Sequence, residues 1–134
     1  MSSAEVRYLK INFDEILSRL KGYAKSKAGT HEVRAIVLTG SLAKGSYTGT
    51  SDADILVIAD NLPTSILERY ALFAEPSMPI DLQPRVYTTK EFMSKLHQGD
   101  RFAVESLEIG MPLHGEQFFK GLRNLEATAR VTMS

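Results

Sequence analysis

The sequence contains no cysteine among its 134 residues. Disulfide bonds, thiolate zinc sites and cysteine nucleophiles are therefore excluded. No hydrophobic run approaches the roughly 20 residues that a membrane-spanning helix needs. Because the N-terminal segment has no charged stretch followed by an apolar stretch, the pattern predicts no signal peptide and no membrane partner. We expect a cytoplasmic protein.

Net charge is missing as well, because 16 basic residues balance 16 acidic residues. Broad electrostatic binding to nucleic acid usually needs a positive excess or a basic stripe along one face. No dense run of lysine and arginine is present, which argues against nucleic acid as a partner but still allows a basic rim around a nucleotide pocket. The hydrophobic share of 43% and the charged share of 24% are ordinary for a globular protein.

Hydrophobic periodicity predicts an alternation of helices and short strands. Residues 13–28 carry apolar side chains at helical spacing, and Asn12 with Glu15 resembles a capping box at the start of that helix. Pro84 lies within the last predicted strand and indicates an edge strand, a bulge or an early end. Apolar and β-branched runs predict three strands, at residues 33–39, 52–59 and 78–87.

The second half of the sequence predicts mainly helices. Pro63 and Thr64 open one whose apolar face holds Ile66, Leu67, Tyr70 and Phe73. Capping residues predict further helices that begin near Thr88, Asp100 and Gln117. This order of elements is typical of an α/β (α+β) fold, with a small mixed β-sheet flanked by helices.

A glycine and a serine, Gly40 and Ser41, directly follow the first predicted strand. Glycine lets the backbone approach a bulky anion closely, and exposed backbone N–H groups at a helix start attract phosphate. Taken alone, such a pair is more often a simple turn with a serine N-cap. Its interpretation therefore depends on the residues that follow.

Two aspartates, Asp52 and Asp54, stand at the start of the second predicted strand. Side chains two residues apart in a strand point to the same face, so these carboxylates converge at the strand end. Two like charges so close are unfavourable unless a cation or a proton lies between them, and magnesium prefers hard oxygen ligands. The alternative is a polar turn before the strand, but Ala53 and the apolar run that follows favour carboxylates within the sheet.

A third aspartate, Asp81, lies between Ile80 and Leu82 and is expected in the middle of the third strand. Aspartate is disfavoured inside strands, so its presence there needs a reason. If this strand neighbours the second, Asp81 completes a three-carboxylate site suited to two-metal phosphoryl or nucleotidyl transfer. The alternative is an edge-strand charge that discourages aggregation.

Together these residues resemble the DNA polymerase beta nucleotidyltransferase superfamily, in which Gly-Ser, ten further residues, Asp-x-Asp and a later strand aspartate form the motif. The short length is similar to that of the minimal nucleotidyltransferases of prokaryotes. The resemblance runs from the first helix to about Gly115 and implies the DNA polymerase beta-like nucleotidyltransferase fold. We expect residues 1–134 to form a single nucleotidyltransferase domain with its core at about 12–115, followed by a C-terminal helix and a frayed tail.

The resemblance also implies the roles of particular residues. It implies two magnesium ions and a substrate that is ATP or another nucleoside triphosphate. The sequence departs from the family pattern at Leu42, where a basic residue is frequent. The implied site residues are Gly40, Ser41, Lys44 and Ser51 for the nucleotide, and Asp52, Asp54 and Asp81 as both catalytic residues and metal ligands.

Minimal nucleotidyltransferases often act as antitoxins beside a helical HEPN-domain ribonuclease. The resemblance implies transfer of AMP from ATP to a tyrosine of that HEPN toxin. Both a homo-oligomer and a hetero-oligomer are compatible with the sequence. One alternative is a binding module that neutralises its partner by contact alone. Another is one half of a split enzyme that modifies an aminoglycoside or a nucleic acid end. The neutral charge argues against tRNA or DNA as that acceptor.

Arg85 lies on the Asp81 face of the third strand if that strand stays regular past Pro84. Its side chain could contact a phosphate or pair with an acidic residue, and an ion pair is the favoured interpretation. The three histidines are scattered without metal-binding spacing, so we expect them to be structural or surface residues.

Overall fold

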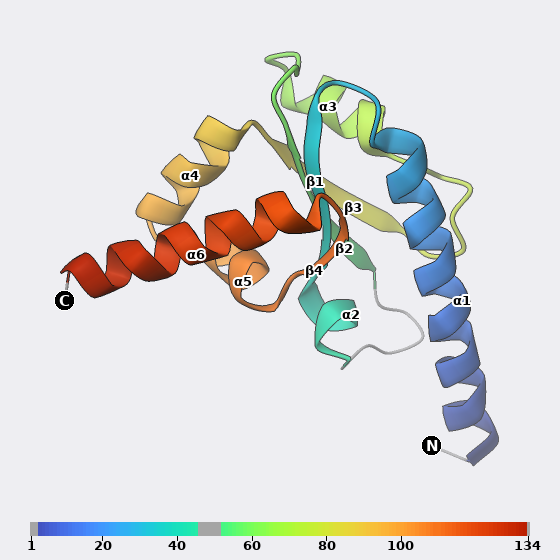
Figure 1. Cartoon of the computed structure of the whole chain (residues 1–134). Coiled ribbons are helices and arrows are strands. Elements are labelled where there is room, and N and C mark those ends of the chain that lie inside the picture. Colours follow the sequence, from blue (N-terminus) through green and yellow to red (C-terminus); the bar gives the residue numbers. More distant parts are fainter. Residues whose placement is uncertain (1–2, 46–51, 134) are drawn as a thin grey trace.

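A computed structural model describes residues 3–45 and 52–133 of the chain (Figure 1). Helices and strands alternate in its first half, and helices predominate in its second. No helix among these residues is long and apolar enough to cross a bilayer. In chain order the elements are α1 (Ser3–Lys27), β1 (Val33–Thr39), α2 (Gly40–Lys44), β2 (Ala53–Ala59), α3 (Ile66–Phe73), β3 (Leu82–Tyr87), α4 (Thr89–His97), α5 (Arg101–Ile109), β4 (Met111–His114) and α6 (Glu116–Met133).

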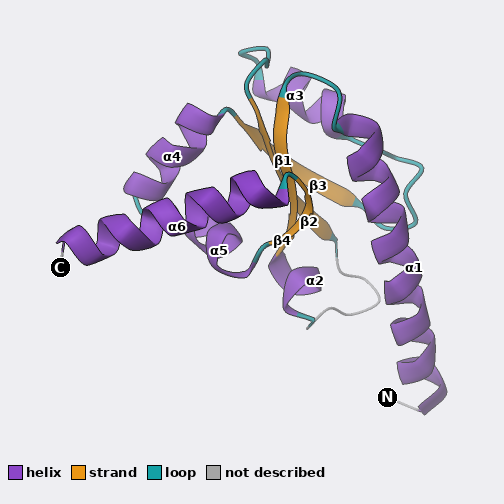
Figure 2. Cartoon of the chain, viewed as in Figure 1, coloured by secondary structure: helices purple, strands orange, loops and turns teal. Residues whose placement is uncertain are grey.

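The four strands form one mixed sheet in the order β3-β2-β1-β4. Strand β1 is antiparallel to both β2 and β4, whereas β2 and β3 are parallel. Helix α1 lies on one side of the sheet, and α4, α5 and α6 lie on the other (Figure 2). The predicted small mixed sheet flanked by helices is therefore confirmed, and Pro84 does lie in an edge strand.

Alternation along β2 divides the apolar side chains between two cores. Ile55 and Val57 pack in the core beneath α1. Leu56 and Ile58 pack in the opposite core, with residues of α4, α5 and α6. Because Asp54 belongs to the second series, its side chain is directed to the face that α5 covers. The hydrophobic pattern of the strand therefore decides on which face this carboxylate lies.

Three predicted boundaries are wrong. Helix α1 begins at Ser3, so the capping box predicted for Asn12 and Glu15 lies inside the helix. Residues 3–15 contain no glycine or proline that would interrupt it. Strand β3 begins at Leu82 rather than near residue 78, because the preceding proline-rich segment forms turns. Asp81 therefore stands directly before the strand and not in its middle. Helix α6 continues to Met133, beyond the predicted end near residue 127.

The predicted apolar packing of α3 is also wrong in part. Phe73 is fully buried, but Ile66 and Leu67 keep 80% and 81% of their surface exposed. Arg69 is buried instead, where its guanidinium donates to the carbonyl of Pro63 at 2.6 Å and to Glu91 Oε1 at 2.7 Å. A buried guanidinium needs such partners. When α3 is oriented to give Arg69 these contacts, its first turn with Ile66 and Leu67 faces solvent.

The end of α1 holds the C-terminus of α3 by hydrogen bonds to its last carbonyls. The hydroxyl of Tyr23 donates to the carbonyl of Phe73 at 2.6 Å, and Lys27 Nζ donates to that of Leu72 at 3.1 Å. These carbonyls lack partners within their own helix, so side chains must satisfy them. Burial, reinforced by Glu75, raises the pKa of the Tyr23 phenol, which keeps the hydroxyl protonated as a donor.

We expect Tyr23→Phe to lower the free energy of unfolding by about 1 to 3 kcal/mol, because it leaves a buried carbonyl without its donor. Urea denaturation of both proteins measures the difference. Tyr70→Phe is the matched control. Because Tyr70 is 42% exposed, this variant should lose little of its free energy of unfolding. Equal losses in the two variants would contradict a specific role for the Tyr23 hydroxyl.

Candidate active site

The end of β1 brings the backbone against a carboxylate of β2. Thr39 pairs with Asp54 in the antiparallel register, and Gly40 follows with φ 73°, in the left-handed region that favours glycine. A Cβ added at Gly40 would collide with Oδ2 of Asp54. Both the conformation and the space at this position therefore require glycine, and the glycine leaves the backbone in direct contact with the acid.

Asp54 is electrostatically coupled to three charged neighbours. Burial raises the pKa of its carboxyl above the ordinary value, the Arg85 guanidinium opposes this effect, and the carboxylates of Asp52 and Glu105 reinforce it. Asp52 itself is exposed at the residue before β2. The charged form of Asp54 is thus disfavoured by its surroundings, and a cation beside it would stabilise that form.

The backbone of Asp81 lies beside the Asp52–Asp54 segment. Its carbonyl accepts a hydrogen bond from the N–H of Ala53 at 2.8 Å, which continues the parallel pairing of β2 and β3. The Asp81 side chain is exposed, and among residues 3–45 and 52–133 no three His, Cys, Asp or Glu side chains form a group that could hold a metal ion. The fold thus brings the three aspartate backbones together, while their side chains do not converge.

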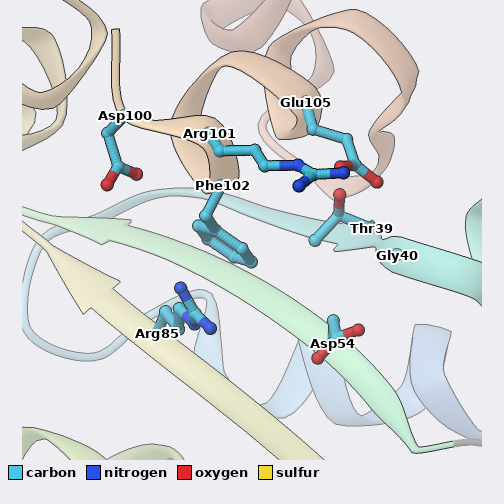
Figure 3. A pocket seen from close by; sticks show the side chains of 8 residues that line it. All are labelled: Thr39, Gly40, Asp54, Arg85, Asp100, Arg101, Phe102 and Glu105. Carbon is cyan, nitrogen blue, oxygen red and sulfur yellow. The ribbon is translucent and has the colours of Figure 1, made fainter. Parts of the chain in front are cut away.

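A cavity of about 380 Å³ opens between the sheet and α5 (Figure 3). Of the predicted site residues, Gly40 and Asp54 line it, and the others that the structure describes do not. Ser51 lies outside the described residues. The wall is formed by residues of β1, α2, β2 and β3 and of the start of α5, which are Thr39, Gly40, Asp54, Arg85, Asp100, Arg101, Phe102 and Glu105.

Arg85 contributes a cation to this cavity. Its guanidinium carbon lies 4.2 Å from the centroid of the Phe102 ring, within the range of a cation–π contact. Among the ion pairs that the described residues form, none includes Arg85. The ion pair favoured from the sequence is therefore replaced by stacking on an aromatic ring, and the guanidinium is directed to the cavity.

Sequence reasoning missed the contribution of α5 to the site. Asp100 was expected to cap this helix, and it does so by accepting the N–H of Ala103 at 3.1 Å. The sequence carries no local signal that the next residues, Arg101, Phe102 and Glu105, face the Asp54 carboxylate. Their position depends on the packing of α5 on the sheet, which only the folded chain reveals.

The structure shows the surroundings of two further positions of α2. Lys44 extends its Nζ to Glu105 Oε1 at 2.8 Å, so it links α2 to α5 at the rim of the cavity. Leu42 is only 1% exposed and belongs to the core beneath α1. A basic residue at position 42 would be buried among apolar side chains, which explains its absence.

Carboxylate oxygens are the ligands that a hard divalent cation such as magnesium prefers. Asp54 offers a carboxylate from β2, Asp52 stands directly before that strand, and the backbone of Asp81 lies beside them. The close approach of Gly40 leaves no side chain between the backbone and Asp54. Among the described residues, no three His, Cys, Asp or Glu side chains form a group that could hold a metal ion, so the role of these three aspartates as metal ligands stays a prediction.

A known protein family matches the chain over more than half of its length. The profile of the family described as nucleotidyltransferase domain matches residues 17–114, a range that includes every predicted site residue. No curated protein matches the chain in sequence.

Two solved structures share the fold at low sequence identity. One is a protein from Sulfolobus solfataricus described as a candidate nucleotidyltransferase, with 18% identity and a TM-score of 0.52 over 70% of this chain and 82% of that chain. The other is a chain of a toxin–antitoxin structure with AMP-PNP, with 19% identity and a TM-score of 0.59 over 87% of this chain and 88% of that chain.

Two glycines allow a direct test of the contact with Asp54. Gly40 and Gly45 both have φ 73°, but a Cβ at Gly45 meets nothing within 4 Å among the described residues. We expect Gly45→Ala to cost about 1 kcal/mol of backbone strain. Gly40→Ala should cost clearly more, because it also displaces Asp54. Chemical denaturation compares the two variants, and equal losses would show that the contact has no energetic weight.

Proposed function

The chain belongs to the nucleotidyltransferase domain family, and we propose that it transfers AMP from ATP to an acceptor hydroxyl with the help of magnesium. The observation that carries this proposal is the half-buried Asp54 carboxylate, in contact with Gly40 at the wall of a cavity that also holds Arg85. In the reaction, the acceptor oxygen bonds to the α-phosphorus, the bond from that phosphorus to the bridging oxygen breaks, and pyrophosphate leaves.

Each predicted residue has a role in this proposal. Asp52 and Asp54 hold the metal, and Asp81 is the third ligand and the base that accepts the proton of the attacking hydroxyl. When bound, two magnesium ions would stabilise the charge that develops on the phosphate oxygens and favour ionisation of the hydroxyl. The residues proposed to contact the nucleotide are Gly40, Ser41, Lys44 and Ser51.

The proposed acceptor is a tyrosine of a HEPN-domain toxin, which the chain would silence as its antitoxin. The likeness to a chain of a toxin–antitoxin structure with AMP-PNP supports both an adenine nucleotide and a toxin partner. In this proposal residues 1–134 act as one nucleotidyltransferase domain in the cytoplasm.

A second function, in which the chain neutralises its partner by contact alone, would use an exposed apolar surface. The first turn of α3 exposes Ile66 and Leu67, and Tyr70 is also 42% exposed. Neighbouring apolar side chains on a surface are typical of a site that binds another protein. Such a surface would serve a catalytic antitoxin equally well, so only a measurement of transfer separates the two functions.

The test is transfer of label from α-labelled ATP, with magnesium, to the protein encoded by the neighbouring gene. We expect label on that acceptor, and we expect Asp52→Ala/Asp54→Ala to reduce its rate by about 100-fold or more, because the charge on the transferred phosphate is no longer stabilised. Asp14→Ala/Glu15→Ala is the matched control, since it also removes two carboxylates but from the exposed surface of α1.

Two outcomes would contradict the catalytic proposal. One is the absence of label although the two proteins bind each other, which would favour neutralisation by contact. The other is label that persists in the Asp52→Ala/Asp54→Ala variant, which would place the chemistry elsewhere. Mass spectrometry of the labelled acceptor identifies the modified residue and tests the proposed tyrosine.

A further inference from the structure

We propose that Arg85, held against Phe102, binds the triphosphate of the nucleotide and balances the Asp54 carboxylate before metal and nucleotide arrive. This inference rests on the proposed function, because that function supplies the identity of the ligand. It assigns a phosphate-binding role to a residue of β3, whereas the residues expected to bind phosphate lie in α2 and in the loop after it.

The alternation of β3 directs Arg85 to the active-site face. Leu82 and Val86 are buried in the core beneath α1, and Pro84 between them is buried as well, so Gln83 and Arg85 face the other way. Arg85 is opposite Leu56 in the parallel register, and Leu56 follows Asp54 on the same face of β2. Arg85 and Asp54 therefore line one cavity from neighbouring strands (Figure 3).

Phe102 restricts the position of the guanidinium without using its hydrogen-bond donors. The ring lies 4.2 Å from the guanidinium carbon and covers one face of the cation. Stacking leaves the N–H groups at the edge of the guanidinium available, and their planar arrangement matches phosphate oxygens. Helix α5 thus holds Arg85 in place before any nucleotide binds.

The other cations at the cavity are less suited to this role. Lys44 is already engaged with Glu105 at 2.8 Å. Arg101 also lines the cavity, but its charge acts on Glu105, whose pKa it helps to lower after the larger effect of Lys44. Arg85 stands on the strand that pairs with the strand of Asp54, and both residues line the same cavity. It is therefore the cation most closely linked to the proposed metal ligand.

The charges predict opposite effects of Arg85 on the two ligands. A cation that binds to Asp54 is repelled by the guanidinium, so removing Arg85 should strengthen the binding of metal in the absence of nucleotide. A triphosphate is attracted by the same guanidinium, so removing Arg85 should disfavour the nucleotide. A purely structural role would instead weaken both ligands together or neither.

The test measures binding to the purified full chain by isothermal titration calorimetry, with Mn²⁺ alone, Mg-ATP and Mg-tripolyphosphate as ligands. We expect Arg85→Gln to bind Mn²⁺ roughly 2- to 10-fold more tightly than the wild type. It should bind ATP and tripolyphosphate about 10- to 100-fold more weakly. Arg85→Lys keeps the charge but loses the planar donors, so its affinities should lie between those of the wild type and those of Arg85→Gln.

Two further variants support the interpretation of these affinities. Arg34→Gln is the matched control, because Arg34 also carries one positive charge but pairs with Asp60 on the exposed surface. It should leave all three affinities unchanged. Phe102→Leu alone should weaken ATP binding several-fold. Added to Arg85→Gln it should have little further effect, because Phe102 acts by holding the guanidinium.

Several results would overturn the inference. Weaker binding of ATP with unchanged binding of tripolyphosphate would place Arg85 at the nucleoside instead of the phosphates. Loss of Mn²⁺ binding together with loss of ATP binding would indicate that Arg85 has a structural role. Unchanged ATP binding by Arg85→Gln would contradict this inference alone, whereas failure of the wild-type protein to bind either phosphate ligand would contradict the proposed function as well.

Discussion

The site depends on the antiparallel register of β1 and β2. In this register Thr39 is opposite Asp54, so Gly40, where β1 ends, meets the carboxylate near the start of β2. A slip by one residue would turn Asp54 toward the core beneath α1 and bring an apolar side chain into the cavity. The register is strongly specified because both faces of the two strands are buried. The packing of two cores therefore also positions the chemistry.

Features that arise from local alternation could be predicted from the sequence. Strand β1 and the core of β2 were predicted because their apolar runs are short and β-branched. The nucleotidyltransferase family could be recognised for the same reason, since its motif lies almost entirely at the ends of these two strands.

Features that arise from tertiary packing could not be predicted. The start of β3 depends on where turns release the chain, so Asp81 was placed inside a strand that it precedes. Helix α3 was expected to bury its apolar residues, but the hydrogen bonds of Arg69 to Pro63 and Glu91 decide its orientation. A helical pattern indicates which residues share a face, and only the surrounding partners decide whether that face is buried.

The distribution of charge around Asp54 follows from the demands of the core. Leu42 fills the space beneath α1, so this position of α2 cannot carry a cation, and Lys44 reaches outward to Glu105. A cavity that is to accept a triphosphate must then draw its positive charge from another element. Strand β3 offers Arg85 on the correct face, and α5 offers the ring of Phe102 to hold it. In our proposal Arg85 therefore supplies positive charge to the cavity from the strand next to that of Asp54.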